Sequence, residues 1–142
     1  MLSVIVDARR APQGLGALLA QLTAGAVDGL VREVAIVAPP GDLIAAICAE
    51  TGAEPHDSLA AAAGAAKAEL VMVLPAALRL RDGWLGSLAG FLADGGRAAR
   101  VAGLARGLRA PAGVLVAREK ALEAADLQAL RRQLGLRSPR VG

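Results

Sequence analysis

Aromatic side chains and cysteine are nearly missing from the sequence. The aromatic residues, Trp84 and Phe91, make up 1% of the chain, so stacking on bases, sugar rings or proline-rich peptides has little to rest on. The single cysteine, Cys48, excludes an internal disulfide, and with the single histidine, His56, it cannot complete a zinc site of cysteine and histidine ligands. The sequence therefore predicts an aliphatic core and a cytoplasmic protein.

Long uncharged stretches are also missing, although 55% of the 142 residues are hydrophobic. No 18 consecutive residues lack a charge, so no transmembrane segment is predicted. Residues 1–7 have neither a basic segment before their apolar run nor a small-residue cleavage site after it, which argues against a secretory signal. A chain of this length has room for one domain. We expect that domain at residues 1–135 and a flexible basic tail at residues 136–142.

Negative charge is scarce in the second half of the chain. Residues 1–71 hold 4 Lys and Arg against 8 Asp and Glu, whereas residues 72–142 hold 12 against 5. A basic half can attract phosphates or an anionic surface, although exposed charge is also ordinary protein surface. No nucleic-acid partner is predicted, because the basic residues lack interleaved aromatics and form no DNA- or RNA-binding motif.

Apolar periodicity predicts strands that alternate with helices. Strands are expected at residues 2–6, 32–37, within 51–56, at 69–74, 100–105 and 113–117. Helices are expected after residues 14 and 41, at 59–67, at about 84–92 and at 118–134, with Asp42, Asp57 or Ser58, and Asp82 as N-caps. This alternation is typical of an α/β fold: one small Rossmann-like domain with an open, mostly parallel sheet flanked by helices.

Several residues resemble reactive motifs, but each has a structural explanation. Gly14-Leu-Gly16 lacks the third glycine of a dinucleotide-binding loop and lies too far beyond the strand. His56-Asp57-Ser58 contains the residue types of a catalytic triad, yet adjacent side chains point in different directions, so His56 is expected in an edge loop. Cys48 lies on the apolar side of its helix and is expected to be a buried, inert thiol. Trp84 is expected to be a core anchor.

Ligands of open α/β sheets bind beyond the carboxyl ends of the strands. Here those ends are Asp7–Arg10, Ala38–Gly41 and Pro75–Ala77. Only the first is rich in polar groups. Arg9 and Arg10 suit a diphosphate, and Asp7 suits a hydrogen bond from a base or a ribose.

Three segments resemble the nucleotide-sugar half of family 2 glycosyltransferases. They are Leu2-Ser-Val-Ile-Val-Asp-Ala-Arg9, Val31-Arg-Glu-Val-Ala-Ile-Val37 and Glu69-Leu-Val-Met-Val-Leu-Pro-Ala-Ala-Leu-Arg-Leu-Arg-Asp-Gly-Trp-Leu85. The resemblance covers residues 2–93, with a weaker similarity at residues 113–119. It implies a GT-A fold and a ligand that is a nucleotide-sugar or a diphosphate.

The positions that carry function in that family differ here. Where the family has a nucleoside-binding aspartate, this chain has Ala38, followed by Pro39. The family's D-x-D carboxylates hold a divalent metal, but Pro75–Ala77 offers no side-chain oxygen, so no metal or other cofactor is expected. The acceptor half of the family is largely missing. The resemblance thus implies no catalytic residue and a vestigial nucleotide site at Asp7, Ala8, Arg9, Arg10, Ala38, Pro39, Pro75 and Ala77.

Three functions stay open at this point. The first is a glycosyltransferase-like scaffold without catalysis that binds or regulates a protein partner through its basic half: Arg79, Arg81, Arg97, Arg100, Arg106 and Arg109. The second is a weak, metal-independent transferase or nucleotide-binding protein in which Arg9 and Arg10 balance the diphosphate. The third is a homo-oligomer that covers an exposed sheet edge or face.

Overall fold

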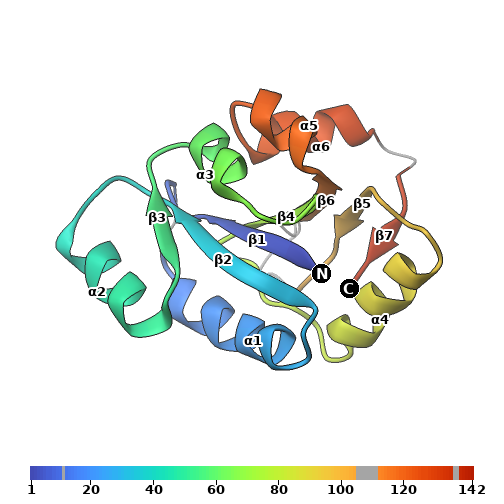
Figure 1. Cartoon of the computed structure of the whole chain (residues 1–142), viewed down its shortest axis with the longest axis horizontal. Coiled ribbons are helices and arrows are strands. Elements are labelled where there is room, and N and C mark those ends of the chain that lie inside the picture. Colours follow the sequence, from blue (N-terminus) through green and yellow to red (C-terminus); the bar gives the residue numbers. More distant parts are fainter. Residues whose placement is uncertain (11, 105–111, 136–137) are drawn as a thin grey trace.

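Apolar, β-branched segments form the central sheet of a single α/β domain. The computed structural model describes residues 1–10, 12–104, 112–135 and 138–142. Within these ranges the strands form one sheet in the order β3-β2-β1-β4-β6-β5-β7 (Figure 1). The strands are β1 (Leu2–Asp7), β2 (Val31–Val37), β3 (Glu54–His56), β4 (Leu70–Pro75), β5 (Ala99–Val101), β6 (Gly113–Ala117) and β7 (Arg140–Val141).

The sheet is mostly parallel, as the sequence predicts. β1 pairs in parallel with β2 on one side and β4 on the other, and β3 continues this parallel half at the edge. β6 runs antiparallel to both β4 and β5. β1 and β4 are covered on both faces, which explains their unbroken runs of apolar residues.

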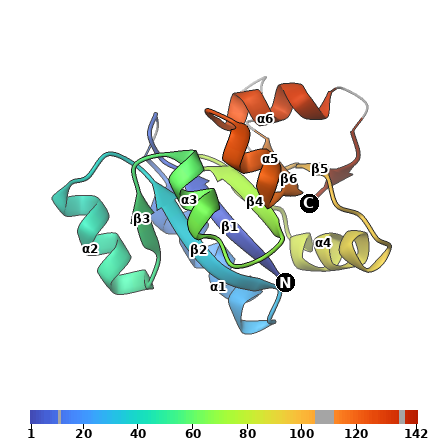
Figure 2. The same ribbon diagram turned by 45° about the horizontal axis from the view of Figure 1, so that its top comes forward.

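Helices cover both faces of the sheet. α1 (Leu15–Val27) and α4 (Trp84–Ala93) pack on one face, and α2 (Asp42–Thr51) lies at the β3 end of that face. α3 (Leu59–Ala65), α5 (Arg118–Glu123) and α6 (Leu127–Leu134) pack on the other (Figure 2). Trp84 is only 7% exposed in the core under α4, as expected of an anchor. Within the described ranges, no helix is long and apolar enough to cross a membrane.

Two of the expected helix caps are wrong. The Ser58 side chain caps α3 as predicted, accepting a hydrogen bond from the Ala61 N–H at 3.0 Å. The N-cap of α2 is Gly41, so Asp42 is already helical. The N-cap of α4 is Gly83, with a left-handed φ of +84°. That turn places Asp82 one residue too early to reach the helix.

The expected helix at 118–134 is in fact two helices, α5 and α6. The first helix ends at its C-cap, Ala124. The Asp126 carboxylate then caps the second helix by accepting a hydrogen bond from the Ala129 N–H at 2.8 Å. Aspartate competes in this way with helix continuation, because its oxygen replaces a main-chain acceptor. The break starts α6 in a new direction beside β4 and β6.

The last described residues, 138–142, lie within the segment expected to be a flexible tail, and part of them joins the sheet. Arg140–Val141 forms β7, parallel to β5. The Arg100 N–H donates to the Pro139 carbonyl at 2.8 Å, and the Ala102 N–H donates to the Val141 carbonyl at 2.7 Å. β5 otherwise has an edge of unpaired main-chain groups, which need partners when they are buried. β5 itself is shorter than expected, and Arg106 and Arg109 lie outside the described residues.

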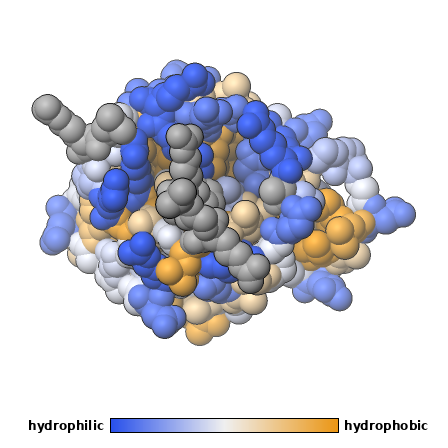
Figure 3. All heavy atoms as spheres, turned by 180° about the vertical axis from the view of Figure 1, so that it is seen from behind, coloured by the Kyte–Doolittle hydropathy of each residue, from blue (hydrophilic) through white to orange (hydrophobic). Residues whose placement is uncertain are grey.

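The outer edges of the sheet offer little for pairing with another chain. β3 has three residues and carries Pro55, which has no N–H to donate, and β7 has two residues. On the face shown in Figure 3, apolar side chains gather at the end carrying α2, where no helical residue is fully buried and Leu43 is exposed. The homo-oligomer stays a prediction.

Candidate anion-binding site

A hollow of about 430 Å³ opens at the carboxyl ends of β1 and β4. These ends lie side by side because Asp7 pairs in register with Pro75. The turn between α5 and α6 forms the opposite wall. The described residues that line the hollow are Asp7, Arg9, Arg10, Pro75, Ala76, Ala77, Ala125, Asp126, Leu127, Gln128 and Arg131.

Asp7 holds Arg9 in a two-point ion pair. The Arg9 Nε donates to Asp7 Oδ1 at 3.1 Å, and Nη2 donates to Oδ2 at 2.9 Å. The Arg9 main-chain N–H also donates to Oδ1, at 3.1 Å. Both Asp7 oxygens are therefore used within the protein. In the structure Asp7 orients Arg9, and the hydrogen bond expected from a base or ribose stays a prediction.

The ion pair shifts the acidity of Asp7. Burial acts to raise the pKa of the carboxyl, but the hydrogen bonds from Arg9 and the charges of Arg9 and Arg10 lower it, and the net pKa lies below its ordinary value of 3.8. A carboxyl with a lowered pKa stabilises the folded state above pH 3.8, and the contribution is lost as the pH falls through the folded-state pKa.

We expect Asp7→Asn to lower the free energy of unfolding at pH 7 by about 1–2 kcal/mol, since hydrogen bonds to charged groups are lost. Urea denaturation at pH 7, 5, 4 and 3 measures the difference between variant and wild type. It should stay constant above pH 3.8 and shrink below it, because the carboxyl of the unfolded chain then takes up a proton before the folded one does. A difference that is the same at every pH would contradict the assigned role.

Arg131 joins the site from α6, although no local pattern in the sequence predicts it there. Its Nε donates to the Ala112 carbonyl at 2.7 Å, and its Nη2 donates to the same oxygen. Arg9 and Arg131 are thus each anchored through Nε and Nη2. In neither side chain does Nη1 make a hydrogen bond to a described residue. Each of the two guanidinium groups is therefore fixed through its Nε and Nη2, and its Nη1 is available to donate to a ligand.

A further arginine, Arg100, lies near Arg131. Arg100 on β5 donates from Nη2 to the Gly135 carbonyl at 3.0 Å, and its Nε is buried with no partner among the described residues. Burial and the charge of Arg100 lower the pKa of Arg131, while Asp126 acts in the opposite direction. The like charges of Arg100 and Arg131 therefore lie close enough to affect each other.

Three of the eight residues predicted for the site lie elsewhere. Asp7, Arg9, Arg10, Pro75 and Ala77 line the hollow, but Ala8, Ala38 and Pro39 do not. Ala8 and Ala38 are buried, and their N–H groups donate to the carbonyls of Val37 and His56. Sequence reasoning missed Asp126, Gln128 and Arg131, because it treated residues 118–134 as one uninterrupted helix.

The hollow does not fit a divalent metal. Such ions take several oxygen ligands. The two carboxylates of the hollow are Asp7, whose oxygens both accept from Arg9, and Asp126, whose Oδ1 caps α6. In the part of the chain that the structure describes, no three His, Cys, Asp or Glu side chains gather as metal ligands.

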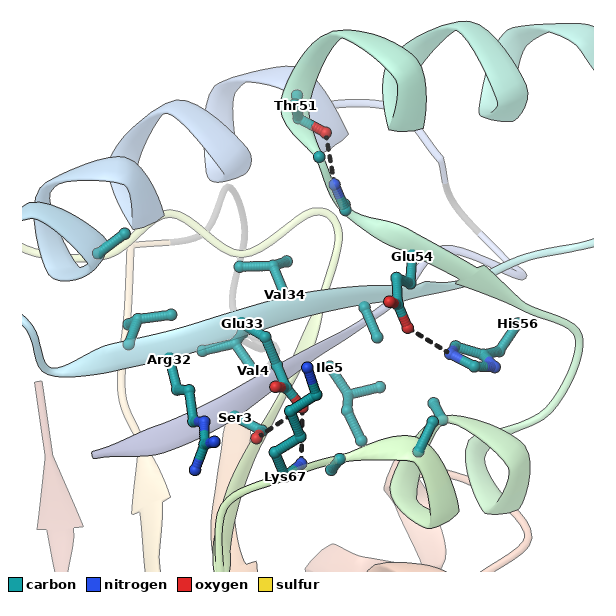
Figure 4. Close-up of a pocket in the computed structure, with 18 residues that line it drawn as sticks. Ser3, Val4, Ile5, Arg32, Glu33, Val34, Thr51, Glu54, His56 and Lys67 are labelled. Carbon is teal, nitrogen blue, oxygen red and sulfur yellow. Dashed lines mark hydrogen bonds and ion pairs between the residues drawn. The ribbon is translucent and has the colours of Figure 1, made fainter.

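A second cavity, of about 290 Å³, lies at the β2–β3 edge and contains the His56 side chain (Figure 4). His56 Nε2 lies 3.9 Å from Glu54 Oε2. Glu33 accepts hydrogen bonds from the Ser3 hydroxyl and the Lys67 N–H, whereas His56 Nε2 is buried without a hydrogen-bond partner among the described residues. With the Ser58 hydroxyl capping α3, His56, Asp57 and Ser58 form no catalytic triad.

Cys48 differs slightly from expectation. It packs against the core from α2 but is only half-buried. Burial raises the pKa of its thiol, which lowers the fraction of reactive thiolate. An inert thiol agrees with this environment.

Comparisons with known proteins connect this geometry to a fold. A scan against models of protein families and a search of curated protein sequences both find no match. Among solved structures, the Mycobacterium tuberculosis rv0371c homolog from mycobacterium sp. strain JC1 is similar with a TM-score of 0.61 and 16% identity, over 99% of this chain and 84% of that one.

Two synthases are also similar. Glucosyl-3-phosphoglycerate synthase from Mycobacterium tuberculosis, in complex with Mn²⁺, uridine diphosphate (UDP) and phosphoglyceric acid, gives a TM-score of 0.59 at 16% identity, over 84% of this chain. Mannosyl-3-phosphoglycerate synthase from Rubrobacter xylanophilus gives 0.55 at 16% identity, over 72%. This chain spans 56% and 39% of their lengths. At these identities the similarity shows the fold: the chain has the α/β fold of GT-A-type glycosyltransferases.

Proposed function

We propose that the protein is a glycosyltransferase-like binding domain that holds the phosphate groups of a nucleotide or nucleotide sugar, without a divalent metal and without sugar transfer. One observation carries this proposal. Arg9, Arg10 and Arg131 surround one hollow at the carboxyl ends of β1 and β4, where open α/β sheets bind ligands.

The arginines are arranged as an anion site needs them. Arg9 is held by Asp7, and Arg131 is held by the Ala112 carbonyl. A phosphate group would meet donors already in place, so little side-chain freedom is lost on binding. Arg10 is exposed beside them and adds charge. Hydrogen bonds between guanidinium and phosphate are among the stronger ones in proteins.

The same hollow offers little for transfer chemistry. A general base must reach the proton that it removes. Of the two carboxylates here, Asp7 accepts three hydrogen bonds from Arg9, and Asp126 caps α6 through Oδ1. The similar synthase was solved with Mn²⁺ and UDP, whereas the carboxylates of this hollow do not suit a metal. These features support binding in place of turnover.

Isothermal titration with UDP and UDP-glucose, in EDTA and in Mn²⁺, tests the proposal. We expect the dissociation constants in EDTA and in Mn²⁺ to agree within about twofold and to rise several-fold with added salt, as the arginine charges are screened. UDP-glucose should stay intact on long incubation. Absence of binding, binding only with Mn²⁺, or protein-dependent release of UDP would overturn the proposal.

Asp126→Asn sharpens this experiment. Asparagine caps helices as well as aspartate does, so α6 should stay folded while one negative charge leaves the hollow. We expect UDP to bind about threefold more tightly to this variant in EDTA, because the anion loses a repulsive neighbour. Weaker binding in EDTA would indicate that Asp126 takes part in holding the ligand.

A further inference from the structure

We infer that the hollow recognises the phosphate groups of its ligand alone, so that inorganic pyrophosphate binds about as tightly as a nucleoside diphosphate. This inference rests on the proposed function and goes one step further, because it removes the nucleoside from recognition. It is carried by what surrounds the arginines at the carboxyl edge of the sheet.

The end of β2, next to β1, offers almost no main-chain donors for a base or a ribose. The Ala38 N–H donates to the His56 carbonyl at 3.0 Å, and the Ala8 N–H donates to the Val37 carbonyl at 2.9 Å. Pro39 and Pro40 follow, and proline has no N–H. The main-chain donors of Ala8 and of residues 38–40 are therefore either used or missing.

Side chains at this end are equally unsuited to a nucleoside. Ala38 carries no polar group, and both oxygens of Asp7 already accept hydrogen bonds from Arg9. Bases are commonly held by stacking on aromatic rings. Trp84 and Phe91, the aromatic residues of the chain, both lie on α4, and neither is among the described residues that line the hollow.

The phosphate side differs in each of these respects. Arg9 and Arg131 keep their Nη1 groups without a hydrogen bond to a described residue, and Arg10 is exposed at the rim. The rest of the lining is mainly apolar: Pro75, Ala76, Ala77, Ala125 and Leu127. Charged donors would therefore meet the phosphates, while the described lining offers a nucleoside few polar side chains besides Asp126 and Gln128.

Titration with pyrophosphate, UDP, guanosine diphosphate and uridine, all in EDTA, tests the inference. We expect the first three to bind within about threefold of one another, a difference of about 0.7 kcal/mol, and uridine not to bind. UDP that binds more than about tenfold more tightly than pyrophosphate would overturn this inference and leave the proposed function standing. If none of the diphosphates binds, the proposed function fails with it.

Gln128→Ala is the matched variant for this experiment. Gln128 carries the one neutral polar side chain among the described lining residues, and it is exposed on α6, so its loss should not disturb the fold. We expect the ratio of UDP to pyrophosphate affinity to stay within about twofold of the wild-type ratio. A shift of about tenfold in favour of pyrophosphate would show that Gln128 reads the base, and the inference would then be wrong.

Discussion

Replacing Arg9 and Arg10 together by glutamine is expected to weaken UDP binding by about 30-fold or more. That factor corresponds to roughly 2 kcal/mol, which is within the range of one or two charge-assisted hydrogen bonds. Arg9 supplies a donor group whose direction Asp7 fixes, and Arg10 supplies charge at the rim of the same hollow. Glutamine keeps much of the side-chain length and removes the charge, so the effect reports on charged recognition.

The matched control is the double variant Arg97→Gln with Arg132→Gln. Both arginines are exposed, and neither is among the described residues that line the hollow. The control loses the same formal charge as the test variant, so a general electrostatic effect would weaken binding equally in both. We expect the control to lose less than about threefold by titration at fixed salt. Circular dichroism checks that both variants are folded, since Arg9→Gln leaves Asp7 without its ion pair.

The second large effect is expected in the sheet, at Gly113. A Cβ atom on this first residue of β6 would overlap Leu74 Cδ2 and would lie 2.9 Å from the main-chain oxygen of Val73. The leucine side chain can move, but the strand carbonyl cannot move without disturbing the β4–β6 pairing. We expect Gly113→Ala to lower the free energy of unfolding by about 2–3 kcal/mol, the cost of overpacking a core, and to lower Tm by about 5–10 °C.

Gly86→Ala is the control for that prediction. Gly86 is exposed in the middle of α4, with no atom within 4 Å of where a Cβ would lie. Alanine is the better helix former, so this variant should gain about 0.5–1 kcal/mol. Urea and thermal denaturation of both variants measure the two signs. A Gly113→Ala variant as stable as wild type would show that β6 and β4 are not packed as described.

The parallel half of the fold could be predicted from the sequence because its signals are local. β1 and β4 are unbroken apolar runs, and each is followed by turn residues and then a helical pattern. The antiparallel half has weaker signals. β7 has two residues and is defined by its pairing with the outer edge of β5. No local pattern at residues 138–142 predicts that pairing.

The candidate site was predicted in part for the same reason. Asp7, Arg9 and Arg10 directly follow a recognisable strand, so their place at the sheet edge could be expected. Arg131 reaches that edge only because Asp126 ends the α5–α6 turn and restarts the helix. The sequence does not predict the pairing of Asp7 with Arg9 either, because both residue types at a strand end also suit a ligand.

The order of strands in space has a consequence for the time course of folding. The parallel half is complete once residue 75 has been made, and its neighbours are joined by connections of ordinary length. β5 at residues 99–101 must wait for β6 and then for residues 139–141 before both of its sides are paired. During synthesis the parallel half can therefore form before the antiparallel half is paired. We expect the amides of β1 and β4 to become protected from hydrogen exchange before those of β5.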